Sequence, residues 1–219
     1  IMLAVLISTA TITWNFSGLL IDFVELVGIF AAVVSSVITF GLWIPFIGFI
    51  VNPRPYLAPK TWLIFAAGEG FFIGSFSLTF ETMFPGIVLE AVSLTFCVAA
   101  TLLFLYKSGL VKPSQNFVLM LCSAIFGILL FYIGVFIYTL VTGTSPEILS
   151  GSSNFSIGLS LFIVGIAALS LVLDFDIIEQ SAERGAPKYM EYFGAMALVT
   201  TLIWLYMEIL RLLAKLRSR

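Results

Sequence analysis

Two carboxylates, Asp174 and Asp176, stand at the end of an uninterrupted apolar run, in the stretch LVLDFDIIEQSAERG. The chain has no histidine, which excludes Ser-His and Cys-His catalysis and removes the usual neutral-pH switch residue. Proton chemistry must therefore use carboxylates or Lys, Tyr and Cys side chains. The candidates within apolar runs are Asp174, Asp176 and Glu69, with Glu208 as a secondary candidate.

The chemistry open to these acids is proton sensing or cation binding. Asp174 and Asp176 are two residues apart, so about 200° separates their side chains on a helix. One interpretation is that one aspartate faces the protein and the other meets headgroup water. The functional interpretation pairs Asp174 with Glu69, because two close carboxylates share a proton. Such a pair could gate a cation path, or bind a transient cation through its oxygens.

The composition indicates that lipid is the solvent. Of 219 residues, 61% are hydrophobic and 10% are charged, whereas soluble domains carry about 25% charged residues. The net charge of −2 is too small to favour nucleic acid as a partner, and no motif calls for a cofactor. Cys97 and Cys122 lie in apolar runs at unrelated spacing, which predicts small buried side chains rather than a metal or redox site.

A spanning helix needs about 20 apolar residues to cross a hydrocarbon core about 30 Å thick. The chain has seven candidate runs within one transmembrane domain, residues 1–219. The first run is short, so we expect that its helix is truncated. The predicted class is thus an all-α polytopic membrane protein with seven transmembrane helices. The runs are 1–14, 27–50, 61–83, 85–106, 117–141, 157–178 and 190–213.

The basic residues predict the orientation. Three of the connecting segments carry Lys or Arg, and the alternate connections carry none. The basic segments, and with them the amino terminus, are therefore expected on the cytoplasmic side. The basic tail disagrees, because seven crossings place it outside. The residues concerned are Arg54 and Lys60, Lys107 and Lys112, Arg184 and Lys188, and, in the tail, Arg211, Lys215, Arg217 and Arg219.

Depth separates the four candidate acids. A helix beginning at Ile157 places Asp174 about 26 Å along its axis, close to the cytoplasmic boundary. Glu69 follows Trp62 by seven residues and lies about 10 Å in from the same face. Glu208 is near the outer end of the seventh helix. The expected gate is therefore an acidic cluster of Asp174, Asp176 and Glu69 in the cytoplasmic leaflet.

Two longer stretches resemble a known family. LDFDIIEQSAERGAPKYMEYFGAMALVTTLIWLYMEILRLL and EGFFIGSFSLTFETMFPGIVLEAVSLTF resemble the Bax inhibitor-1/YccA family. They are most similar to a bacterial, transmembrane Bax-inhibitor-motif-like branch with a D-F-D-x-I-E motif followed by A-P-x-x-M-E. The resemblance covers roughly residues 40–213. It implies a seven-helix fold with the last helix central, in a bacterial plasma (inner) membrane.

For characterised members the resemblance also implies a pH-sensitive calcium leak through two aspartates, one on helix six and one on helix seven. The helix-six position falls on Asp174. The helix-seven candidates are Ala195 and Val199, which cannot ionise, so the known pair is incomplete here. Our hypothesis is that Asp176 or Glu69 replaces the missing partner.

Two functions remain open at this point. The first is a pH-sensitive calcium or cation leak with the acidic cluster as its proton-sensing gate. The second is a non-enzymatic regulatory or structural partner of a membrane protein complex, because other family members are linked to a membrane-anchored quality-control protease. An enzyme is not expected: an intramembrane aspartyl protease needs aspartates on two helices and a G-x-G-D motif, which this sequence lacks.

Overall fold

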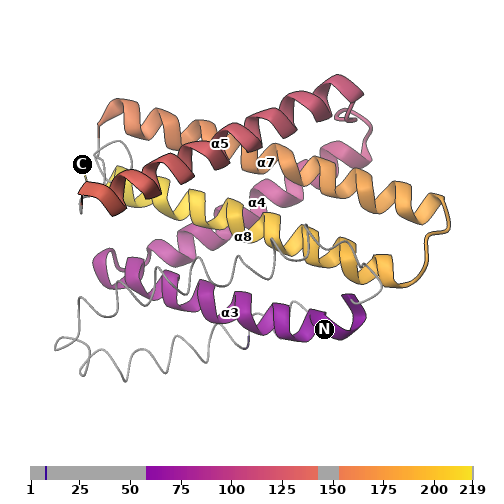
Figure 1. Cartoon of the computed structure of the whole chain (residues 1–219), viewed down its shortest axis with the longest axis horizontal. Helices are drawn as coiled ribbons and strands as arrows, with labels where there is room; N and C mark the ends of the chain where they lie inside the picture. The colour runs from indigo at the N-terminus through magenta and orange to yellow at the C-terminus, as the bar shows by residue number, and fades with distance from the viewer. Residues whose placement is uncertain (1–7, 9–57, 143–152, 219) are drawn as a thin grey trace. The chain divides into compact units, whose positions relative to one another are not determined.

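The computed structural model describes residue 8 and residues 58–142 and 153–218. Every regular element in these ranges is an α-helix, and the described ranges contain no strand, which confirms the all-α class for this part of the chain. The predicted runs 1–14 and 27–50 lie outside the described residues, so the number seven stays a prediction. The helices of Figure 1 are α3 (Ala58–Met83), α4 (Ile87–Lys107), α5 (Gln115–Thr142), α7 (Asn154–Glu183) and α8 (Tyr189–Arg217).

All five helices are long and apolar enough to cross a membrane. Their apolar spans of 21 to 30 residues measure about 31–45 Å at 1.5 Å per residue, against a hydrocarbon core of about 30 Å. Large apolar side chains such as Leu89, Phe104 and Leu119 are exposed on their surfaces. Lipid solvates such side chains, so their exposure costs nothing in a bilayer. The chain is an integral membrane protein.

Helix α7 corrects the predicted run 157–178. The helix begins three residues earlier and ends five residues later, at Glu183. Its start is fixed by Ser153, whose side chain accepts a hydrogen bond from the Ser156 amide at 3.2 Å and so caps the helix. Its end is followed by Gly185 at φ 63°, a conformation that favours glycine. Asp174 and Asp176 therefore lie inside the helix, and Asp174 is about 30 Å from its start.

The other boundaries move less. Helix α3 begins at Ala58 rather than 61, α5 extends by two residues before 117 and one after 141, and α8 continues from 213 to Arg217. A turn at Pro85-Gly86 separates α3 from α4, and Gly86 has φ 85° at the N-cap of α4. A residue with a Cβ would be strained there. The extension of α8 matters most, because it makes the basic tail part of a helix.

The chain divides into two compact units, the first comprising residues up to Pro85 with Gly185–Val199, and the second Gly86–Arg184 with Thr200–Arg219. The second unit therefore holds α4, α5, α7 and most of α8. Within it, α7 contacts both α4 and α5. Side-chain contacts join the end of α8 to the starts of α4 and α7, and the end of α4 to the late part of α7. Helices α4 and α7 thus run parallel, and this part of α8 runs antiparallel to both.

Helix α8 is the most enclosed of the described helices. Six consecutive residues, Leu205–Leu210, are buried, which is more than one and a half turns, so no side of this segment is open. The position of the last helix at the centre of seven helices stays a prediction. The prediction that Cys97 and Cys122 are buried was wrong, since both are exposed. Lipid accepts an apolar thiol as readily as a protein core does, so apolar surroundings in the sequence did not require burial.

The helix directions of the second unit generate a topology prediction. In a chain whose native cysteines are replaced by serine, Lys112→Cys and Glu183→Cys should react with a membrane-impermeant thiol reagent from the same face of sealed vesicles. Ser218→Cys should react only from the opposite face, because α8 runs antiparallel to α4 and α7. Labelling of all three positions from one face would contradict this arrangement.

Candidate functional site

Asp174 lies on α7 and faces α8. Its side chain is half-buried and has the side chain of Thr201 on α8 as a hydrogen-bond partner. The second carboxyl oxygen, Oδ2, is buried and has no hydrogen-bond partner among the residues that the structure describes. A buried polar atom without a partner is rare in folded proteins. This oxygen is the feature of α7 that most needs a chemical explanation.

Asp176 faces α4 instead. The buried Tyr106 donates its hydroxyl towards Asp176 Oδ1 at 3.3 Å and to Glu179 Oε2 at 2.5 Å. Gln180 Nε2 donates to the other Asp176 oxygen at 2.6 Å, and Arg184 donates to Gln180 Oε1 at 2.9 Å. Gln180 thus holds one oxygen of Asp176, and the single Tyr106 proton is shared unequally between Glu179 and the other Asp176 oxygen. The two predicted gate aspartates point to different helices, as their separation on α7 requires.

Glu69 lies on α3, in the first unit, and its side chain is half-buried. It stands within the sequence Gly68-Glu69-Gly70. Asp174 and Asp176 belong to the second unit. The pairing of Glu69 with Asp174, and a transient cation held between them, stay predictions. Within the described ranges, no three or more Cys, Asp or Glu side chains group closely enough to hold a metal ion.

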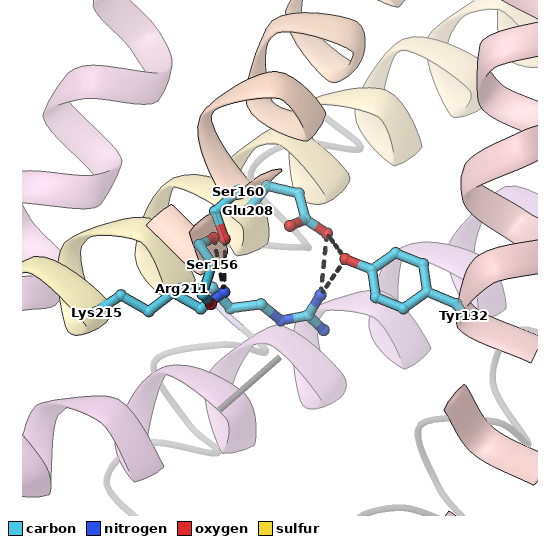
Figure 2. A network of polar contacts seen from close by, with 6 residues as sticks. All are labelled: Tyr132, Ser156, Ser160, Glu208, Arg211 and Lys215. Atoms are coloured by element: carbon cyan, nitrogen blue, oxygen red, sulfur yellow. Dashed lines mark hydrogen bonds and ion pairs between the residues drawn. The ribbon is translucent and has the colours of Figure 1, made fainter. Parts of the chain in front are cut away.

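Glu208, the secondary candidate, anchors a polar network about midway along the part of α8 that belongs to the second unit (Figure 2). It is only 2% exposed. Its Oε1 atom accepts hydrogen bonds from the Tyr132 hydroxyl and from Arg211 Nη1, both at 2.9 Å. Arg211 also donates to the Tyr132 oxygen at 3.1 Å, and its guanidinium lies 5.6 Å from the Tyr132 ring centroid. The buried carboxylate is thus neutralised by a cation from its own helix and held by a phenol from α5.

Two more basic residues, Lys215 and Arg217, follow Arg211 towards the end of α8. Lys215 is buried, and its Nζ donates to Ser160 Oγ at 2.7 Å and to the Ser156 carbonyl at 3.4 Å, both on α7 (Figure 2). Arg217 forms an ion pair with Glu90 on α4 at 2.6 Å. The three cations of α8 therefore reach three different helices. Lys215 is thus enclosed between helices, whereas Arg217 stays exposed in its ion pair. The orientation of the chain in the membrane stays a prediction.

Sequence reasoning found Glu208 but missed its partners. One signal was available: Glu208, Arg211 and Lys215 recur at spacings of three and four, which places them on one face of a helix. That stripe could have been recognised once α8 was extended beyond 213. The partners Tyr132, Ser156 and Ser160 carried no comparable signal, because they lie on other helices and are ordinary residues of apolar spans.

Asp174, Asp176 and Glu179 gather towards the end of the second unit where α4 and α7 finish, which we call the acidic end, and Arg184 reaches them only through Gln180. Lys107 ends α4 at the same end, and Lys112 follows it in the chain. Towards the opposite end, which we call the basic end, three cations of α8 lie with two carboxylates, Glu90 and Glu208. Both ends therefore carry charges of both signs.

Comparison with known proteins gives one match. A family model described as Bax inhibitor 1 like matches residues 1–218. Neither the search of curated proteins nor the search of solved structures found a significant match.

The network around Glu208 generates a stability prediction. Tyr132→Phe removes the hydroxyl that donates to Glu208, so we expect the free energy of unfolding, measured by titration with a denaturing detergent, to fall by about 0.6–2 kcal/mol. Arg211 still neutralises Glu208 in this variant, which limits the loss. Tyr138→Phe is the matched control, since Tyr138 is an exposed residue of the same helix, and it should shift stability by less than about 0.5 kcal/mol. Equal losses in the two variants would contradict the assignment.

Proposed function

The chain belongs to the Bax inhibitor 1 like family, and we propose that this integral membrane protein provides a pH-sensitive leak path for calcium or other cations. Its gate is the acidic end of the second unit, with Asp174 as the proton-sensing carboxyl and Asp176 beside it. Glu69 on α3 is the proposed partner of Asp174. The protein acts in a bacterial inner membrane, with the amino terminus and the acidic end on the cytoplasmic side.

The observation that carries this proposal is the Oδ2 atom of Asp174, which is buried and has no hydrogen-bond partner in the described part of the chain. A carboxylate oxygen without a donor in an apolar span is costly, and ionisable groups in spans usually mark ion or proton pathways. A proton on this oxygen removes the negative charge, and a passing cation compensates it. The same atom can therefore hold either a proton or a cation, so proton binding competes with cation binding. This competition is what makes a leak sensitive to pH.

The neighbouring acids, Asp176 and Glu179, contribute to the cation path rather than to the proton-sensing gate. Asp176 and Glu179 are held by Tyr106, and they extend negative charge from Asp174 towards the end of α7. Carboxylates lining one mouth raise the local concentration of cations. Because each of them has a hydrogen-bonding side chain on another residue, whereas Asp174 Oδ2 has none among the described residues, we assign them to attraction and Asp174 to gating.

The partner of Asp174 differs from the one that the resemblance implies. Ala195 and Val199 occupy the helix-seven positions, and the residue of α8 that interacts with Asp174 is Thr201. A hydroxyl can orient a carboxyl but cannot share its charge. We therefore propose that Glu69 supplies the second carboxylate of the gate.

The first test is calcium uptake into vesicles that contain the purified chain. Asp174→Asn removes the group that exchanges proton and cation, so the dependence of uptake on pH between about pH 5 and pH 8 should flatten. Glu183→Gln, at the exposed end of α7, is the control and should keep the wild-type profile. Identical profiles for wild type and Asp174→Asn would contradict the proposal. Wild-type vesicles as tight as empty ones would instead favour a regulatory or structural partner of another membrane protein.

The second test concerns Glu69. If Glu69 and Asp174 form one gate, Glu69→Gln should change the pH profile of uptake, and the double variant Glu69→Gln/Asp174→Asn should change it no further than either single variant does. Residues that act independently give additive effects, so additivity of the two changes would reject the pairing. Glu81→Gln, on the same helix, controls for the loss of a negative charge from α3.

A further inference from the structure

The basic end of the second unit has a feature that the proposed leak does not use. Three cations in the last turns of α8 are each engaged with a different element. Arg211 bonds to Tyr132 on α5, Lys215 bonds to α7, and Arg217 pairs with Glu90 on α4.

We propose that these three cations form an ionic lock that closes the end of the second unit opposite Asp174. The lock consists of Arg211, Lys215 and Arg217 together with their partners on α4, α5 and α7. It rests on the proposed function for its purpose, since it would regulate the far mouth of the same cation path. Whether the lock exists does not depend on the leak, because the lock is defined by the side chains that hold the helices together.

Burial supports the inner contacts of the lock, and the exposed Arg217–Glu90 pair closes its outer side. Glu208 and Lys215 are 2% and 8% exposed, so their bonds are shielded from both water and lipid headgroups. Polar groups at this depth keep their partners, because leaving them unpaired is costly. Each bond to Tyr132, Ser160 or Glu90 crosses from α8 to another helix. Moving any of those helices away from α8 breaks at least one of these bonds.

The lock is also the place where the unit can open. Arg211 and Arg217 keep 35% and 33% of their side-chain surface exposed, so water can take over their hydrogen bonds when a helix moves. Exposed ion pairs contribute little to stability on their own. A lock built from one enclosed anchor, Lys215, and two partly exposed arginines can therefore release in steps. While it is closed, its positive charge repels a cation that approaches from this side.

Access to a buried position behind the lock tests this inference without measuring flux. Ile163 is 2% exposed and follows Ser160 by one turn on the same face of α7. In a chain with Cys97→Ser and Cys122→Ser, Ile163→Cys should react slowly with a positively charged, membrane-impermeant thiol reagent. Adding Arg217→Glu places a second carboxylate opposite Glu90, and we expect the reaction to become about tenfold faster. Exchanging the charges, with Glu90→Arg and Arg217→Glu together, should restore the slow rate.

Lys107→Glu is the matched control, because Lys107 ends the same helix that Glu90 begins; this charge reversal should leave the rate unchanged. Arg217→Gln serves the same measurement if Arg217→Glu does not yield a folded protein, with a smaller increase expected. An unchanged rate in the Arg217 variants would overturn the lock, and so would an increase that the charge exchange does not reverse. If the vesicles show no calcium uptake, the proposed leak is rejected but the thiol reaction rates are unaffected. The two proposals can therefore fail separately.

Discussion

Lipid offers no hydrogen bonds, so each polar group inside a membrane-spanning helix must find its partner within the protein. The described helices meet this constraint in two ways. Hydroxyls such as Ser77, Thr95 and Ser170 return to a carbonyl of their own helix, at 2.6–2.7 Å. Longer side chains reach across to another helix, as Tyr106 and Tyr132 do to carboxylates on α7 and α8. These cross-helix bonds fix which helices of the second unit stay together.

Against this background Asp174 stands apart, because one of its oxygens is buried without a partner in the described part of the chain. Its near neighbour Asp176 has a hydrogen-bonding side chain beside each of its oxygens, the Gln180 amide beside one and the Tyr106 hydroxyl, shared with Glu179, beside the other. Glu208 shows that even a nearly inaccessible carboxylate can be neutralised and bonded within the protein. The missing hydrogen bond at Asp174 Oδ2 is therefore a property of that position in the described residues, and the other buried acids do not share it. That contrast is the reason for assigning the gate to Asp174.

The helices could be predicted from the sequence because lipid imposes length and apolarity on every span, and both are readable from composition. Their ends were less predictable. Glu, Gln, Ala and Arg after Asp176 are good helix formers, so α7 continued beyond its apolar run to Glu183. In the same way, α8 continues beyond 213 to Arg217, so the basic tail is helical and its cations contact other helices. Tertiary partners such as Tyr132 and Ser160 could not be foreseen, because periodicity places residues on one face of a helix but does not say which helix that face meets.

The most direct test of this account is a structure of the chain in a lipid nanodisc, determined with calcium present and at a resolution that shows ordered water. The account predicts a water molecule or a cation within bonding distance of Asp174 Oδ2, with the Glu69 carboxylate as the other ligand. A protein hydrogen-bond donor on that oxygen, with Glu69 directed elsewhere, would contradict it.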